Sequence, residues 1–266
     1  MGYLGDGNAV AAHLAGQVAA NWWDNNAAEY LKDHGSFLGA VNFRWGPEGV
    51  TEADLGLLGP VAGKRILEIG AGAAHCSRWL ATQGATPTAT DISAAMLAQA
   101  QKLNEVTGIN FDLQLCDARN LPYDAETFDL AFTSFGAIQF IPDLPALFSE
   151  VHRVLKPGGK WVFSVTHPFR WAFPDDPTKH GLTIIRSYFD RRPYAEFDDA
   201  GQPEYLEYHR TIGDYVRDLA AAGFTLTDIV EPEWPADNAQ VWGGWGPERG
   251  TYLPGTAIFS AVRQGL

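Results

Sequence analysis

The sequence is poor in cysteine and in positive charge. Its 266 residues include two cysteines, and 19 lysines and arginines against 32 acids, which gives a net charge of −13. Cys76 and Cys116 are too few for a disulfide framework or a four-cysteine zinc site, and we expect both to be buried structural thiols. An acidic chain has few cations with which to displace counterions from a nucleic acid or an anionic membrane. A small molecule or a protein remains as the partner.

Long apolar runs are missing as well. No stretch reaches about 18 consecutive apolar residues, and the start "MGYLGDGNAV" has neither the basic residues nor the apolar core of a signal peptide. No His, Cys and carboxylate cluster has metal-ligand spacing, and no G-x-S-x-G hydrolase turn occurs. We therefore expect a cytoplasmic protein without a metal site.

Strand and helix patterns alternate through the middle of the chain. Apolar, strand-like runs are separated by segments with helical spacing that stop at glycine. The expected strands are 64–69, 85–91, 109–117, 128–134, 159–166, 225–234 and 256–262, and the expected helices between them are 73–84, 93–108, 144–159 and 212–224. This order predicts an α/β fold with a doubly wound, mostly parallel seven-stranded sheet.

Two segments fall outside the alternation. Residues 8–34 have Ala, Leu, Trp and Tyr at helical spacing, with a stop at His34-Gly35. Residues 167–210 are rich in aromatics, Asp and Pro, which is typical of an inserted hairpin or cap. We expect an N-terminal helical arm or lid over 1–58 and a main domain over 59–266 that carries the cap 167–210.

The stretch "ILEIGAGAAHCSRW", Ile66 to Trp79, joins an expected strand to an expected helix. Glycines at such a turn let a ligand approach backbone N–H groups at the carboxyl edge of the sheet. A dinucleotide fingerprint needs glycine at the first, third and sixth places, and here the sixth place is His75. A nicotinamide-dependent oxidoreductase is therefore the less favoured interpretation.

The turn reads Glu68-x-Gly70-x-Gly72-x-Ala74, and with this acid before the first glycine the chain resembles the class I S-adenosylmethionine-dependent methyltransferases. Asp91, twenty-one residues after Gly70, ends the second strand, where a carboxylate can accept hydrogen bonds from ribose hydroxyls. "LQLCDARNLPYD" and "EVHRVLKPGGKWVFS" also match the family. The resemblance covers Lys64 to Thr166 most closely.

The resemblance implies S-adenosyl-L-methionine as cofactor and assigns its site. The glycine loop would pass under the methionine part, Asp117 would accept from the adenine amino group, and the N–H of Ala118 would donate to the ring. Met96 would pack near the adenine. The arm would close over the cofactor through Tyr30 and the "FRWG" loop. The full set implied to bind the cofactor is Tyr30, Glu68, Gly70, Ala71, Gly72, Asp91, Ile92, Met96, Asp117, Ala118, Ser134 and Phe135. Ala74 stands where a third glycine is usual, and we expect it to alter the shape of the loop.

The acceptor side is less defined. Methyl transfer to a hydroxyl benefits from a base, and His167, after the fifth strand, and His209, before the last large helix, are the candidates. A structural role is the alternative for each. Aromatic residues outside the strands could line an apolar acceptor pocket or pack the cap onto the sheet. They are Trp22, Trp23, Tyr30, Phe43, Trp45, Trp171, Tyr188, Tyr194, Tyr205, Tyr208, Trp242 and Trp245.

The sequence therefore predicts a methyltransferase that acts on a small, partly apolar metabolite, at oxygen or else at carbon or nitrogen. A nicotinamide-dependent oxidoreductase and a non-catalytic binding protein with the same fold are the alternatives. A protein substrate is less favoured because a capped pocket would hinder a large chain.

Overall fold

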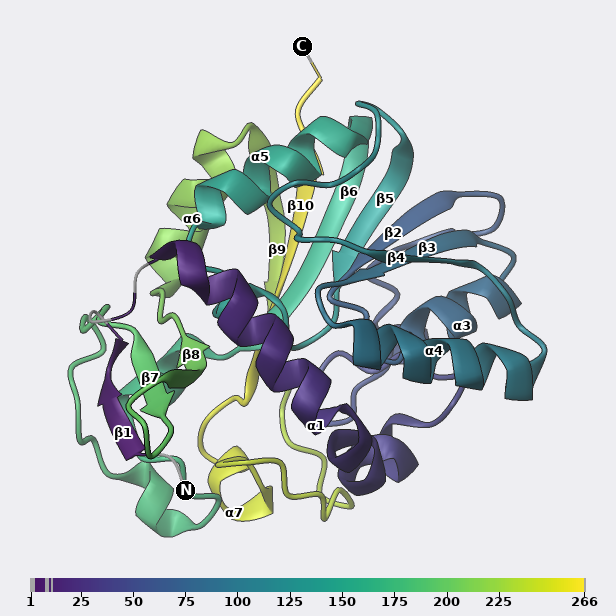
Figure 1. Ribbon diagram of the computed structural model, residues 1–266. Coiled ribbons are helices and arrows are strands. Elements are labelled where there is room, and N and C mark those ends of the chain that lie inside the picture. Colours follow the sequence, from purple (N-terminus) through teal and green to yellow (C-terminus); the bar gives the residue numbers. More distant parts are fainter. Residues whose placement is uncertain (1–2, 8–9, 11, 266) are drawn as a thin grey trace.

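A computed structural model describes residues 3–7, 10 and 12–265. Its centre is a seven-stranded sheet in the order β4-β3-β2-β5-β6-β10-β9 (Figure 1). β10 is antiparallel to both of its neighbours and the other strands run parallel. The predicted fold class is thus confirmed. The strands are β2 (Arg65–Ile69), β3 (Thr86–Asp91), β4 (Asp112–Leu115), β5 (Phe128–Thr133), β6 (Leu155–Thr166), β9 (Phe224–Val230) and β10 (Thr256–Arg263).

Helices cover the sheet on both faces, because the central strands are apolar on both sides. Leu67 and Ile69 of β2 point to the face covered by α5 and α6, and Ile66 points to the opposite face against α3 and the segment 43–58. The helices are α1 (Ala15–Leu38), α2 (Glu52–Leu55), α3 (His75–Thr82), α4 (Ala94–Thr107), α5 (Leu144–Val154), α6 (Ile212–Ala221) and α7 (Pro247–Gly250). None of the helices in the described ranges is long and apolar enough to cross a lipid bilayer.

A second, smaller sheet lies beside the main one in Figure 1 and joins the two segments that interrupt the alternation. β1 (Tyr3–Asp6) pairs antiparallel with β7 (Tyr194–Phe197), which pairs with β8 (Pro203–Glu207). The β7-β8 hairpin lies within 167–210, where we expected an inserted hairpin or cap, whereas β1 was not expected. Helix α1 lies between this sheet and α4, in contact with both β8 and α4.

The N-terminal helix is longer than predicted. Gly35 does not end α1, which continues to Leu38 and closes with the Gly39 N–H donating to the Gly35 carbonyl at 2.9 Å. Glycine inside a helix costs about 1 kcal/mol relative to alanine. Contacts of the added turn offset that cost. The Arg44 guanidinium lies over the Phe37 ring, 4.4 Å from the ring centroid, and the same ring packs against Trp242.

The helix before β6 is shorter than predicted. α5 ends at Val154 and β6 begins at Leu155, so residues 156–159 ("KPGG") are part of the strand and not of the helix. The expected burial of the two thiols holds for Cys76 in α3, whereas Cys116, just after β4, is only half-buried.

Candidate functional site

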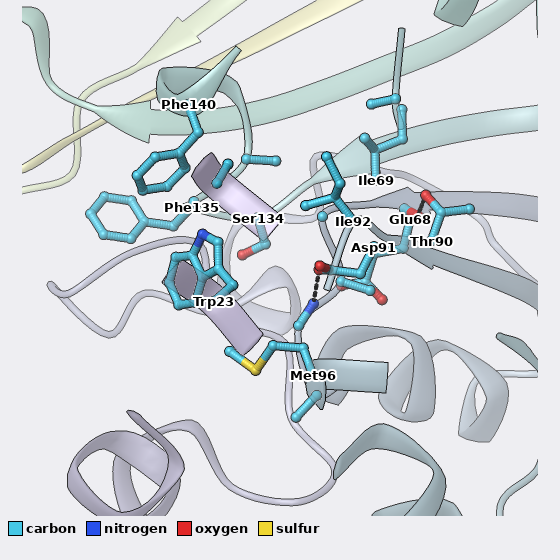
Figure 2. A pocket seen from close by; sticks show the side chains of 18 of the residues that line it. Trp23, Glu68, Ile69, Thr90, Asp91, Ile92, Met96, Ser134, Phe135 and Phe140 are labelled. Atoms are coloured by element: carbon cyan, nitrogen blue, oxygen red, sulfur yellow. Dashed lines mark hydrogen bonds between the residues drawn. The ribbon is translucent and has the colours of Figure 1, made fainter. Parts of the chain in front are cut away.

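One pocket lies at the carboxyl ends of β2, β3 and β5, under helix α1. All twelve residues that the resemblance assigned to the cofactor line it, and we call it the glycine-turn pocket. Figure 2 shows Glu68, Asp91 and Met96 on one side and the rings of Trp23, Phe135 and Phe140 on the other. Parallel strands end at one edge of the sheet, and that brings together residues far apart in the sequence.

The glycines of the turn keep the pocket open. Gly70 has a φ of +69°, and a Cβ there would lie 2.3 Å from the Ala137 Cβ. Gly72 has a φ of +53°, and its Cβ would enter free space with the Met96 Cε 3.8 Å away. Ala74 itself takes the left-handed conformation, with φ 55° and ψ 40°. Ala74 therefore takes a conformation that glycine would favour, at a cost of about 1–2 kcal/mol.

Asp91 connects two turns of the pocket. One carboxylate oxygen accepts from the Gly72 N–H at 2.7 Å, the bond drawn in Figure 2, and the other accepts from the Ser93 N–H at 2.8 Å. Burial raises the pKa of this carboxyl. Asp91 does not cap α4, because Ser93 is the N-cap and accepts from the Met96 N–H. A carboxylate has about four acceptor sites, so hydrogen bonds to a ligand remain available.

Glu68 is buried beneath the same turn. Its carboxylate accepts from the backbone N–H of Ser77 at 3.1 Å and from the Ser77 hydroxyl at 2.5 Å, which fixes the first turn of α3. Burial raises the pKa of Glu68 to about 7, against the opposing effect of these hydrogen bonds. The neighbouring His75 has its pKa lowered to about 4 by burial and by the charge of Arg78.

Asp117 already has a partner within the chain. The Arg119 guanidinium donates to both of its carboxylate oxygens, with the Nη2 to Oδ2 distance at 2.6 Å. Burial works against ionisation of Asp117, but the hydrogen bonds from Arg119 outweigh it and lower the pKa. α1 packs closely on this pair, since a Cβ on Gly16 would lie 3.0 Å from the Arg119 Nη2.

The arm contributes directly to the glycine-turn pocket. Trp23 and Tyr30 of α1 line it, and so do Arg44 and Gly46 of the "FRWG" loop. Phe43 and Trp45 of the same loop are instead core residues packed against Phe132. The loop therefore anchors the arm to the sheet as well as bordering the pocket.

A second pocket adjoins the first on the side of the small sheet. The two share Trp23, Tyr30, Phe135, Gly136, Phe140 and Trp242. Rings form most of its wall, with edge-to-face pairs Trp22–Tyr205 at 5.1 Å and Trp23–Phe140 at 5.7 Å between centroids. Polar side chains also line this aromatic pocket, namely those of His34, Gln139, Thr166, Arg170, Asp175 and Glu207.

The two histidines expected as bases lie elsewhere. Among the described residues that line either pocket, neither His167 nor His209 is found. His167 is fully buried, its Nε2 lies 2.7 Å from a Glu231 carboxylate oxygen, and its Nδ1 accepts from the Phe169 N–H. His209 donates from Nε2 to the Tyr188 carbonyl at 2.7 Å. Both hold the cap segment in place in this structure.

The sequence patterns did not mark His34, Gln139, Arg170, Asp175 or Glu207 as site residues. They come from four separate parts of the chain, with Arg170 and Asp175 in the same segment after β6, and the packing of α1, the small sheet and the 242–245 loop brings them together. No local spacing marks them. Within the described ranges, His, Cys, Asp and Glu side chains do not form a group of three or more that could hold a metal ion.

Comparisons with known proteins agree with this geometry. A family model described as a methyltransferase domain matches residues 66–159. The chain is 31% identical over 216 residues to a ubiquinone biosynthesis O-methyltransferase of Pseudomonas fluorescens strain Pf-5, covering 80% of this chain and 82% of that protein. An S-adenosylmethionine-dependent methyltransferase structure from Mesorhizobium loti is 27% identical with a TM-score of 0.64, and 82% of this chain covers all of that one.

A third similar structure is a 1,6-didemethyltoxoflavin-N1-methyltransferase of Burkholderia thailandensis with bound S-adenosylhomocysteine. It is 19% identical with a TM-score of 0.61, and the match covers 99% of this chain and 95% of that one. At that identity it supports the fold alone.

The chain belongs to the class I S-adenosylmethionine-dependent methyltransferases. It is an enzyme of that class, and S-adenosylmethionine is its cofactor. The glycine-turn pocket fits this cofactor, because Gly72 leaves open the space that a side chain would fill and Asp91 retains free acceptor sites.

Proposed function

We propose that the enzyme O-methylates a small, flat, partly apolar metabolite that carries a hydroxyl group. The observation that supports this most is the aromatic pocket, which shares six lining residues with the glycine-turn pocket. Two ligands seated in adjoining pockets would meet at the shared wall, and methyl transfer requires the acceptor oxygen to lie in line with the sulfonium methyl.

The glycine-turn pocket is proposed to hold the cofactor, as the sequence predicted. Asp91 would accept from the ribose hydroxyls, with Gly70, Ala71 and Gly72 forming the floor. Met96, Ile92, Ala118 and Tyr30 would surround the adenine and its neighbourhood. Asp117 is already bound to Arg119, so we propose that the pair together, rather than the free carboxylate, borders the adenine.

The choice of a flat and partly apolar acceptor follows from the pocket walls. Aromatic rings favour offset-stacked or edge-to-face contact with another ring, and they exclude water from the reacting atoms. The choice of oxygen is supported by relatives that are named O-methyltransferases. A cytoplasmic location remains part of the proposal.

The test combines binding and product analysis. S-adenosylhomocysteine and NADH are titrated into the protein by calorimetry, and S-adenosylmethionine with a labelled methyl group is then incubated with phenols, catechols, aromatic amines and thiols. We expect binding of S-adenosylhomocysteine alone and labelled products from hydroxylated rings. Products only from amines or thiols would overturn the choice of oxygen.

Two variants separate the pockets. Trp22 lines only the aromatic pocket, and Asp91 lines only the glycine-turn pocket. Trp22→Ala should raise the KM for the acceptor and leave the affinity for S-adenosylhomocysteine unchanged. Asp91→Ala should weaken the binding of S-adenosylhomocysteine. If both variants changed both affinities equally, the assignment of two ligands to two pockets would be wrong.

A further inference from the structure

The imidazole of His34 has a fixed place at the junction of the two pockets. It lies near the end of α1 and stacks on the Trp242 ring, with centroids 3.9 Å apart and planes 18° from parallel. The Tyr30 ring, one turn earlier on the helix, lies 5.0 Å from it. Tyr30 and Trp242 line both pockets, so His34 stands next to the shared wall.

No hydrogen bond within the described part of the chain holds either ring nitrogen of His34, and Nδ1 is buried without a partner. This distinguishes it from His167, whose two ring nitrogens are both engaged. A neutral imidazole always has one nitrogen that accepts a hydrogen bond. Nε2 is the ring nitrogen of His34 that is not buried, so the tautomer with its lone pair on Nε2 can accept a hydrogen bond from a ligand in the aromatic pocket.

Burial leaves the ring of His34 neutral near pH 7. Burial lowers its pKa, and the adjacent carboxylate of Asp33 acts in the opposite direction without cancelling the effect. The other titratable groups of the pocket are Tyr30 on the same helix, Arg170 after β6, Asp175 in the following loop, and Tyr205 and Glu207 on β8. Tyr30 stays neutral because burial raises its pKa. A neutral imidazole can accept a proton from a hydroxyl.

We propose that His34 is the general base of methyl transfer, an inference that rests on the proposed O-methylation. The acceptor oxygen forms a bond to the methyl carbon while its O–H bond breaks and the proton passes to the His34 imidazole. The carbon–sulfur bond breaks with its electron pair left on sulfur, which changes from a cationic sulfonium to a neutral thioether. The imidazolium then releases its proton to solvent. General bases of this kind contribute about 10²–10⁴-fold.

The first test uses binding, without turnover. 4-Nitrocatechol changes colour when a hydroxyl ionises, so its absorption reports where the proton is. In the complex with S-adenosylhomocysteine near pH 7, we expect a larger ionised fraction with the wild-type protein than with His34→Gln. His13→Gln is the matched control, since His13 lies exposed before the same helix. Equal ionisation in all three proteins would overturn the proposal.

The second test uses kinetics. His34→Gln should bind S-adenosylhomocysteine with wild-type affinity, lose about 10²–10⁴-fold in kcat, and lose the acidic limb of the kcat against pH profile. Free imidazole should restore part of the activity of His34→Ala, whose shortened side chain leaves room beside Trp242. An unchanged pH limb in His34→Gln, or absence of rescue in an intact His34→Ala, would exclude a base role.

The two proposals fail in different ways. If the wild-type protein methylates no hydroxyl compound, the proposed function is wrong. If it methylates hydroxyls and His34→Gln does so equally well, the function stands and His34 is not the base.

Discussion

The Asp24 carboxylate accepts a 2.6 Å hydrogen bond from the Ser93 hydroxyl, and the same oxygen accepts from the Ala95 N–H at 2.9 Å. Asp24 belongs to the arm, whereas Ser93 caps α4 in the main domain. Because Ser93 also accepts from the N–H of Met96, the contact ties the arm to the helix start that carries Met96 into the pocket.

Asp24→Ala should therefore loosen both the arm and the cofactor site. Loss of a capping interaction typically costs about 1 kcal/mol, so the free energy of unfolding should fall by that amount. The affinity for S-adenosylhomocysteine should fall as well. Urea unfolding and calorimetry measure the two effects. Glu29→Ala, an exposed acid on the same helix, is the control and should change neither. Equal behaviour of the two variants would argue against the connection.

Asp91→Ala should weaken S-adenosylhomocysteine binding by about 1–3 kcal/mol, since polar partners would be left unsatisfied. It should also destabilise the free protein, because the N–H groups of Gly72 and Ser93 lose their acceptor. Asp91→Asn retains one acceptor oxygen and should lose less stability. Asp112→Asn, on the exposed edge strand β4, serves as the comparison. Wild-type affinity in Asp91→Ala would refute the ribose assignment.

Glu68 should make the stability of the free protein depend on pH. Burial raises its pKa from 4.5 to about 7, so folding favours the protonated form. The stability that protonation provides is complete below pH 4.5 and is lost as the pH rises through about 7. The loss is on the order of 3 kcal/mol. Glu68→Gln mimics the protonated form, and the difference in unfolding free energy between the two proteins should grow across that interval. A constant difference from pH 4.5 to 8 would show that Glu68 is ionised throughout.

His167→Ala should lower the free energy of unfolding. The substitution removes the acceptor of the Phe169 N–H and leaves a buried space, which together cost about 1–3 kcal/mol. Thermal unfolding measures this loss. The acidic limb of the kcat against pH profile should remain in the variant. Its disappearance in an intact His167→Ala, together with retention in His34→Gln, would return the base role to His167.

The sheet could be predicted from the sequence because its signals are local. β2, β5 and β6 are rich in apolar residues, and the helices α3, α4 and α5 have apolar residues at helical spacing. The continuation of α1 past Gly35 depends on Arg44 and Trp242, which lie far along the chain. β1 was missed for the same reason, since its partner β7 starts at Tyr194.

In the candidate site, the residues at strand ends could be predicted from the sequence, whereas those of the aromatic pocket could not. Glu68, Gly70, Gly72, Asp91 and Asp117 sit at strand ends, where position in the pattern implies position in space, and all line one pocket. The acceptor side has no such rule. His167 follows a strand end and His209 precedes a helix, yet both lie outside the two pockets. His34 belongs to α1, where it stacks on Trp242 and lines the aromatic pocket.

The pairing of β1 with β7 has a consequence for how the protein is made. During synthesis β1 and α1 leave the ribosome before any part of the main sheet, and the strand that β1 needs emerges only after β6 is complete. Until then the edge of β1 and the indole rings of α1 have no partners in the small sheet, a state prone to wrong association. The aromatic pocket therefore forms late, when the hairpin β7-β8 captures a segment that was translated first.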